Sequence, residues 1–239
     1  MGAIGSILPN KISGLSGWWD ASDYKNLAIG TAVATWNDKT GNNNLTKAGS
    51  GAGLTALDPG GFPCITTGQD TNYYRKTGIT TFTGAAGFTI FSVFSRPTYT
   101  GSTADAQFGH KMLYDGASEC ASAIIQGNTG KGVFVRTFGN GRSGNGTYTV
   151  NRRIIGMSKA STSGNGTYTY ENQNVPGVLQ SQVACAAFTN SCVLTIAQGE
   201  NPSGSLGYHF ETIIYNRVLT EAEYRDVLYY LRTKYSTPA

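Results

Sequence analysis

The most unusual chemical feature of the sequence is a long segment that contains cations and no acids. There is no Asp or Glu between Glu119 and Glu171. The same segment holds six basic residues, so it carries a larger positive charge than the +4 of the whole chain: Lys131, Arg136, Arg142, Arg152, Arg153 and Lys159. Arginine pairs with carboxylate or phosphate through two hydrogen bonds, and tyrosine faces stack on sugar rings. The pattern therefore indicates a surface that binds an anion.

Seven residues in or near the turns of this segment are the candidate ligand-binding residues: Arg136, Asn140, Arg142, Asn145, Tyr148, Arg152 and Arg153. The expected ligand is an anionic glycan or a lipopolysaccharide. Two alternatives stay open, namely docking on an acidic surface of a neighbouring subunit and solvated strand ends with a chance charge imbalance. Nucleic acid is not an expected partner, because the segment lacks a recognised nucleic-acid-binding motif.

Histidine and cysteine chemistry has little support in the sequence. The only histidines are His110 and His209, which excludes a site of several histidines. The four cysteines include no CxxC pair and no zinc-type spacing. We expect free buried thiols, with a Cys185–Cys192 bridge across a hairpin as the alternative.

Loop oxygens could bind calcium, but they have a simpler use. Asp20, Asp23, Asp38 and residues 42–44 supply such oxygens. Asp and Asn in loops commonly accept hydrogen bonds from turn backbone, as expected for Asp38 in the tight turn that ends at Gly41. Metal binding is left open, and no cofactor is predicted.

The composition favours an all-β protein with many turns. Of 239 residues, 32 are Gly and only 13% are charged, whereas 39% are hydrophobic. Low charge with this apolar content argues against disorder and against a charged coiled coil. Short apolar runs separated by turn residues predict strands near 88–94, 107–114, 119–126, 131–138, 153–159, 166–171, 182–188, 191–197 and 207–216. We expect one antiparallel two-sheet jelly-roll sandwich over residues 12–239, preceded by an arm at 1–11.

The end of the chain predicts a single amphipathic helix over about 220–235. Thr220 and Glu223 have the spacing of a capping box, and Leu219 and Tyr224 that of a hydrophobic staple. Apolar residues then recur at three- and four-residue steps to Tyr235. We expect this helix to cover one face or edge of a sheet.

Four segments resemble laminin-G-like, concanavalin-A-like lectin/glucanase modules, which are frequent in bacterial and bacteriophage surface proteins. The opening Gly14–Ser22 and Trp36–Asn42 are similar to the start of such modules. Glu211–Glu223 is similar to their last strand and closing helix, and Ile154–Gly177 to their mid-chain hairpin. The resemblance implies the sandwich fold. From the residues we expect Trp18 and Trp19 on opposite sides of a strand, one of them in the core, and Glu211 bonded to backbone or to an arginine.

Glycanases with this fold carry acids on one strand in the form Glu-x-Asp-x-x-Glu, and that pattern is missing here. A retaining mechanism needs two carboxyl groups about 5 Å apart, and alternate residues of a strand face the same way. The closest strand-like pair, Asp115 and Glu119, is four residues apart. No Gly-x-Ser-x-Gly nucleophile motif is present either. The expectation is that the chain is not an enzyme.

The resemblance and the composition together favour a bacteriophage virion protein, such as a capsid decoration, tail fibre or attachment subunit, that also binds host glycan. Its expected partners are other virion proteins or its own copies, and bacterial surface glycan. The first ten residues lack the features of a secretory signal, and the apolar run Phe88–Phe94 is too short to cross a bilayer. We expect assembly into the virion in the host cytoplasm, without a membrane partner. A free-standing carbohydrate-binding lectin is the alternative, followed by a glycan-cleaving enzyme.

Overall fold

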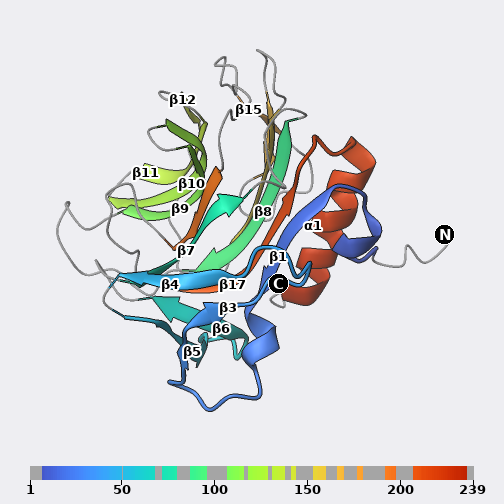
Figure 1. The fold of residues 1–239 in the computed structure, drawn as a ribbon. Coiled ribbons are helices and arrows are strands. Elements are labelled where there is room, and N and C mark those ends of the chain that lie inside the picture. Colours follow the sequence, from blue (N-terminus) through green and yellow to red (C-terminus); the bar gives the residue numbers. More distant parts are fainter. Residues whose placement is uncertain are drawn as a thin grey trace.

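The fold was obtained as a computed structural model, shown in Figure 1. It describes residues 7–49, 51–67, 72–79, 87–95, 107–115, 118–128, 131–137, 141–143, 153–159, 166–169, 177–179, 192–197 and 207–235. Within these ranges the chain forms two antiparallel β-sheets and one α-helix. The all-β sandwich with one C-terminal helix is confirmed.

The first sheet has nine strands and is built around β17 (Gly207–Tyr215). Its order is β15 (Gly177–Leu179), β14 (Gly166–Thr169), β13 (Arg153–Lys159), β8 (Phe88–Ser95), β17, β6 (Pro63–Thr67), β5 (Gly53–Leu57) and β2 (Ala32–Val33). Strand β1 (Leu15–Asp20) also pairs with β17, beyond the part that β6 occupies. Strands from the start and the end of the chain thus meet at the centre of one sheet.

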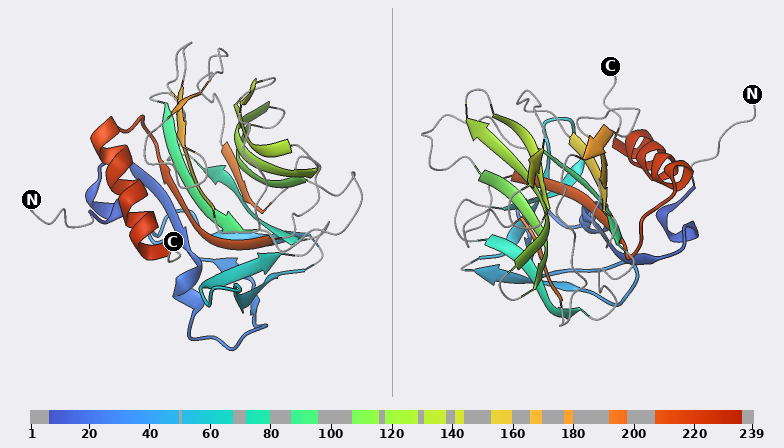
Figure 2. Two further views of the ribbon diagram at one scale, coloured as in Figure 1. Left: turned by 180° about the vertical axis from the view of Figure 1, so that it is seen from behind. Right: turned by 90° about the horizontal axis from the view of Figure 1, so that it is seen from above.

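The second sheet has eight strands. Its order is β12 (Gly141–Ser143), β11 (Lys131–Thr137), β10 (Ser118–Asn128), β9 (Gln107–Asp115), β16 (Cys192–Ile196), β7 (Asn72–Ile79), β4 (Leu45–Gly49) and β3 (Thr35–Trp36). The predicted strands near 107–114, 119–126, 131–138 and 191–197 all belong to this sheet, and the predicted strand 182–188 lies outside the described residues. The two sheets face each other in Figure 2.

The chain passes from one sheet to the other at Ala34. β2 pairs with β5 in the first sheet, and β3 pairs with β4 in the second. The carbonyl of Ala34 between them accepts a hydrogen bond from the amide of Lys47 at 3.0 Å. The backbone at Ala34 therefore connects β2, at one edge of the first sheet, to β3, at one edge of the second.

Helix α1 (Glu221–Tyr235) covers the outer face of the first sheet (Figures 1 and 2). Every residue of β8 is buried, because one face of this strand lies toward the other sheet and the other face lies under the helix. The apolar cluster under α1 includes Phe91, Ile213, Val227 and Leu231. The helix thus forms a third layer, as the amphipathic pattern predicted.

The predicted capping box is present at the start of α1. Glu223 Oε2 accepts from the Thr220 amide at 2.9 Å, and Thr220 Oγ1 accepts from the Glu223 amide at 3.3 Å. Arg217 adds two bonds from its guanidinium to the two Glu223 oxygens, at 2.6 and 2.9 Å. Leu219 and Tyr224, the predicted staple, are both buried in the cluster under the helix. Among the described residues no helix is long and apolar enough to cross a membrane.

Both tryptophans of β1 are buried, which corrects the expectation that one of them enters the core. Trp18 lies under the helix, where its ring meets the edge of Tyr230 at 6.1 Å between centroids. The indole N–H of Trp19 donates to the carbonyl of Asn43 at 3.0 Å. Because the first sheet is covered on both faces, opposite side chains of β1 are both removed from water.

Candidate functional site

The structure places three of the seven predicted ligand-binding residues. Arg136 in β11 and Arg142 in β12 are cross-strand partners in the second sheet. Arg153 begins β13 opposite Phe94, in the first sheet. The structure thus brings two of the arginines together and assigns the third to the other sheet. Asn140, Asn145, Tyr148 and Arg152 lie outside the described residues, and the ligand-binding role of all seven stays a prediction.

A second group of charged residues, which the sequence did not suggest as a site, lies between α1 and the first sheet. It begins with a β-bulge in β17, where the pairing with β8 shifts between His209 and Glu211. A bulge turns two consecutive residues toward the same face. Phe210 packs against the ring of Tyr235 at 5.7 Å, and Glu211 Oε2 accepts from the hydroxyl of the same tyrosine at 2.8 Å. The bulge therefore directs a carboxylate at the helix.

Glu211 receives four hydrogen-bond donors, and none of them is an arginine or a backbone group as the sequence led us to expect. Oε1 accepts from Trp18 Nε1 at 2.5 Å and from the Tyr230 hydroxyl at 3.0 Å. Oε2 accepts from Lys234 Nζ at 2.8 Å as well as from Tyr235. A carboxylate has about four lone-pair positions, so Glu211 is fully satisfied as an acceptor.

Asp20 joins this group as the cross-strand partner of Glu211 in β1. Its Oδ2 accepts from Lys234 Nζ at 2.5 Å and pairs with Lys39 Nζ at 3.0 Å. Lys39 also pairs with Asp23 at 2.9 Å. We call Asp20, Glu211 and Lys234 the lysine clamp, because one ammonium joins two acids of neighbouring strands to the helix.

Burial dominates the electrostatics of the clamp. It raises the pKa of Glu211, and Lys234 opposes this rise while the charge of Asp20 adds to it. Burial also acts to raise the pKa of Asp20, but the ammonium groups of Lys234 and Lys39 outweigh it, so the net pKa is lowered. The pKa of Tyr230 is raised by burial and by the charge of Glu211. The clamp thus holds Asp20 ionised and makes ionisation of Glu211 costly.

The clamp stabilises the fold and offers no surface to a substrate. The side chain of Glu211 is 0% exposed and that of Asp20 is 2% exposed. Two carboxyl groups bound to one ammonium are close enough for glycosidase chemistry, but a sugar needs access to both of them. We therefore assign the clamp to the attachment of α1 to β1 and β17.

The acids considered as calcium ligands have other partners. Asp38 accepts from the amides of Trp18, Thr40 and Asn43 at 2.8 to 3.0 Å. Its carbonyl accepts from the Gly41 amide, and Gly41 has a positive φ of 81°, so the predicted tight turn is confirmed. Asp20 and Asp23 are bound by Lys39, as described above. Across the described part of the chain, no group of three or more His, Cys, Asp or Glu residues could hold a metal ion.

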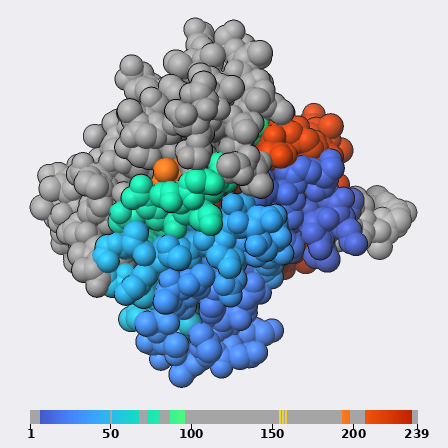
Figure 3. Space-filling model, in the orientation of Figure 1, coloured from blue at the N-terminus to red at the C-terminus, as the bar shows by residue number. Residues whose placement is uncertain are grey.

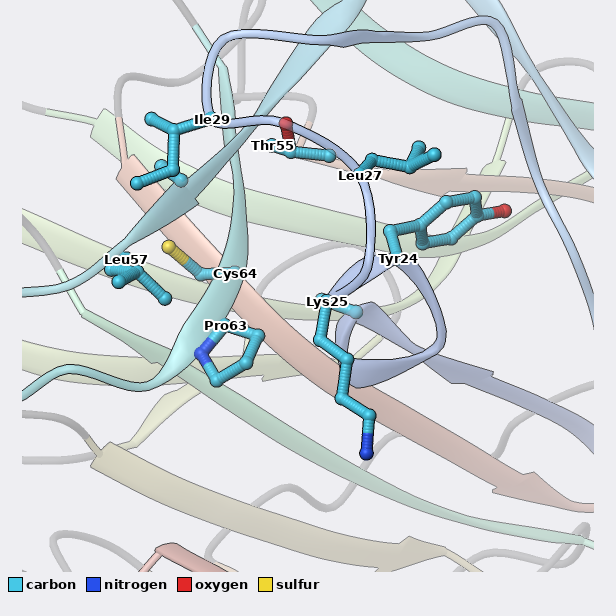
Figure 4. Close-up of a pocket in the computed structure, with 10 residues that line it drawn as sticks. Tyr24, Lys25, Leu27, Ile29, Thr55, Leu57, Pro63 and Cys64 are labelled. Carbon is cyan, nitrogen blue, oxygen red and sulfur yellow. The ribbon is translucent and has the colours of Figure 1, made fainter.

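A small cavity lies beside β5, β6 and the 3₁₀-helix η2 (Ala21–Tyr24) (Figure 4). Its volume is about 30 Å³, which is enough for one water molecule and far too small for a sugar ring. The Cys64 thiol lines it, and burial raises the pKa of this thiol to about 12. Cys64 is a free buried thiol, as expected, and it is not a nucleophile at neutral pH. Cys185 lies outside the described residues, so the alternative disulfide stays untested.

No protein-family model and no curated protein matches the chain. Solved structures with a similar fold exist. The sialidase of Trypanosoma rangeli has a TM-score of 0.57 and 15% identity, over 93% of this chain and 33% of the sialidase. The binding domain of botulinum neurotoxin DC, solved in complex with SialylT, has a TM-score of 0.59 and 10% identity, over 92% of this chain and 52% of that one.

A GH54 α-L-arabinofuranosidase has a TM-score of 0.63 and 13% identity, over 88% of this chain and 53% of the enzyme. The chain therefore spans only about a third to a half of the chains it resembles. At this identity the likeness shows the fold alone, which is a jelly-roll-like β-sandwich of the kind found in lectins and glycosidases.

These comparisons overturn the expectation that the chain is not an enzyme. Sialidases and an arabinofuranosidase are enzymes, and their chains contain this fold. The survey of acids failed for a physical reason, because it considered only acids spaced along one strand. A sheet also brings together carboxyl groups from different strands, as the cross-strand pair Asp20 and Glu211 demonstrates. The spacing of acids in the sequence therefore excludes no glycosidase.

Proposed function

We propose that this chain is a carbohydrate-binding β-sandwich domain. The observation that carries the proposal is the fold shared with the binding domain of the botulinum neurotoxin, which was solved with a sialyl ligand. Two other similar chains are named as glycan-cleaving enzymes. The shortage of charge in the chain and its abundance of Gly-rich turns suit a surface that meets sugars through loops and strand ends.

The test is binding of the purified chain to immobilised glycans. We would use sialylated, sulfated, arabinose-containing and neutral oligosaccharides, and we would measure the affinity of each positive by calorimetry. Binding of at least one class, abolished by thermal unfolding of the protein, is the expected result. Silence across all four classes at millimolar glycan would refute the proposal.

Glycan cleavage is the second candidate function, favoured by the sialidase and arabinofuranosidase folds. Release of nitrophenol from the corresponding nitrophenyl glycosides measures it directly. Turnover that disappears on unfolding supports an enzyme, and binding without turnover at any pH from 4 to 9 supports a binding domain only.

The narrower role of a bacteriophage decoration, fibre or attachment subunit rests on the sequence segments that resemble surface-protein modules. None of the three structures named above is a virion protein. The role predicts self-association or affinity for a particle, which light scattering after size exclusion measures. A monomer that binds no phage particle would contradict it.

A further inference from the structure

The lysine clamp holds an amine against a carboxyl group that is shielded from water. Lys234 Nζ lies 2.5 Å from Asp20 Oδ2, and the side chain of Asp20 is only 2% exposed. A carbon–oxygen bond is about 1.2 Å long, so the carboxyl carbon lies no more than about 3.7 Å from this nitrogen. Reacting atoms held about 3–3.5 Å apart need no encounter in solution, which lowers the barrier to their reaction. The separation in the clamp is close to this distance.

Glu211 is placed to carry protons between these two groups. Its Oε2 accepts from Lys234 Nζ at 2.8 Å, and Glu211 is the cross-strand partner of Asp20. The side chain of Glu211 is 0% exposed, and burial raises its pKa. A carboxylate with a raised pKa accepts a proton more readily than an ordinary one, as a general base must. Glu211 can therefore take a proton from the ammonium and pass it to an oxygen of Asp20.

Two further donors polarise the carboxyl group of Asp20. The amide of Ser22 donates to Oδ1 at 2.9 Å, and Lys39 Nζ pairs with Oδ2 at 3.0 Å. When an amine adds to a carboxyl carbon, negative charge develops on the oxygens, and donors already directed at them stabilise it. The surroundings of Asp20 thus suit attack by the amine of Lys234.

The site also favours a neutral product over separate ions. The rings of Tyr230 and Tyr235 lie 5.7 and 5.1 Å from Lys234 Nζ, so aromatic groups take the place of much of its water. Ions removed from water carry a desolvation penalty, whereas an amide carries no charge. Condensation of the amine with the carboxyl group would remove two charges from the space between α1 and the first sheet.

We propose that Lys234 and Asp20 form an intramolecular isopeptide bond and that Glu211 transfers the protons. The nitrogen of Lys234 bonds to the side-chain carboxyl carbon of Asp20, and one oxygen of Asp20 leaves as water. Of the three ammonium protons, one stays on the amide nitrogen and two leave with that oxygen, so Glu211 ends as it began and no other reactant is consumed. The ionic clamp described above is the state before the bond forms. Formation is slow, because the ammonium groups of Lys234 and Lys39 keep Asp20 ionised.

The bond would join the two ends of the fold. Asp20 is the last residue of β1 and Lys234 lies in the last turn of α1, 214 positions away. Figure 3 shows the beginning of the chain, in blue, directly beside its end, in red. A covalent link between residues so distant in sequence closes most of the chain into one loop and restricts the unfolded state. Linked chains should therefore remain more compact in denaturant than unlinked ones.

Intact-mass spectrometry of the whole chain tests the proposal. The purified protein is kept at room temperature for several weeks and sampled throughout. Lys234→Met removes the amine, and Glu211→Gln keeps both reacting groups but removes the proton carrier. Lys11→Met is the matched control, because Lys11 is an exposed lysine at the end of the 3₁₀-helix η1 (Pro9–Lys11). Circular dichroism establishes that each variant is folded, and tandem mass spectrometry of tryptic peptides locates the bond.

The native chain and Lys11→Met should lose the mass of one water molecule with time, and a branched peptide should join Lys234 to Asp20. Lys234→Met should keep its full mass. Glu211→Gln should lose water about a hundredfold more slowly, which is the usual size of a general acid–base contribution. In denaturing electrophoresis, a faster band should appear only in samples that have lost water.

Four results would overturn the proposal or the roles assigned in it. A native chain that keeps its full mass throughout has no such bond. Loss of water that persists in Lys234→Met arises elsewhere in the chain. A branched peptide that joins Lys234 to Glu211 would reverse the roles of the two acids, and an equal rate in Glu211→Gln would remove Glu211 as the proton carrier. None of these results bears on carbohydrate binding, which the glycan experiment tests separately.

Discussion

Replacing Lys234 by Met tests whether the lysine clamp holds the helix to the sheet. The substitution keeps the length of the side chain and removes the ammonium that bonds to Asp20 and Glu211. Loss of one partner of a buried ion pair costs about 3–5 kcal/mol, since the remaining charge is left uncompensated. The Lys234 side chain is itself 25% exposed, so water compensates part of the loss. We therefore expect the lower end of that range, about 3 kcal/mol.

Urea and thermal unfolding measure this loss. For a chain of this size each kcal/mol lowers the melting temperature by about 2–4 °C, which predicts a decrease of about 6–12 °C. Lys47→Met is the matched control, because Lys47 is exposed on β4 and belongs to no ion pair described above. Its effect should stay within about 0.5 kcal/mol.

The pH dependence of the loss identifies its cause. The pKa of Glu211 is raised in the folded protein, so its ionised carboxylate destabilises the folded state at pH values above the ordinary pKa of a glutamate. This destabilisation disappears when the carboxylate is protonated. Without Lys234, the ammonium charge that lowers the pKa of Glu211 is absent, so this pKa rises further. The loss of unfolding free energy in Lys234→Met should therefore be smaller at pH 5 than at pH 7. A deficit below 1 kcal/mol, or one equal at both pH values, would refute the role assigned to the clamp.

Three further predictions concern the helix cap, the buried thiol and a glycine under the helix. The pKa of Glu223 is lowered to about 2, chiefly by its bonds from Arg217, so its stabilisation should be complete above about pH 4.5 and lost toward pH 2. Glu223→Gln should cost about 1 kcal/mol at pH 7 and almost nothing at pH 2, by urea titration. Cys64 should resist iodoacetamide at pH 8 in the folded protein and react in urea, as peptide mapping would reveal; modification without urea would contradict its burial. Gly156→Ala should destabilise the chain by about 1–3 kcal/mol, because the new Cβ would clash with the Tyr224 hydroxyl of α1. An unchanged melting temperature would contradict this prediction and would show that the helix can shift.

Local patterns in the sequence predicted the local structure well. The helix follows from a capping box and an apolar stripe, both of which lie within residues 219–235. Several strands were predicted to within two residues, including 153–159 and 207–216, since apolar runs bounded by turn residues are also local. The two-sheet fold followed from the number and spacing of these strands.

The lysine clamp could not be predicted in the same way. Trp18 and Glu211 are 193 positions apart, and Asp20 and Lys234 are 214 positions apart. The bulge that turns Glu211 toward the helix depends on how β17 pairs with β8, and no residue type in the strand signals it. A buried acid with a distant lysine partner becomes visible only when the sheet order is known.

The basic segment was recognisable from composition, but its arrangement was not. Lys111 precedes the acid-free segment, and only the strand order shows that its strand β9 belongs to the same sheet as Arg136 and Arg142. Arg153 lies in the segment and yet belongs to the other sheet, because the chain crosses between sheets before β13. Charge counted along the sequence thus located a region and could not define a site.

The pairing of β1 with β17 has a consequence for the order in which the chain folds. β1 leaves the ribosome well before its partner β17, which begins almost 190 residues after β1 ends. Until then Trp18 has neither the strand that pairs with β1 nor the helix that covers it in the finished protein. Contacts this distant in sequence are slow to form, and unpaired strands that carry large apolar side chains aggregate readily. During synthesis the large apolar side chain of Trp18 is therefore left uncovered by β17 and α1 until both of these elements have been made.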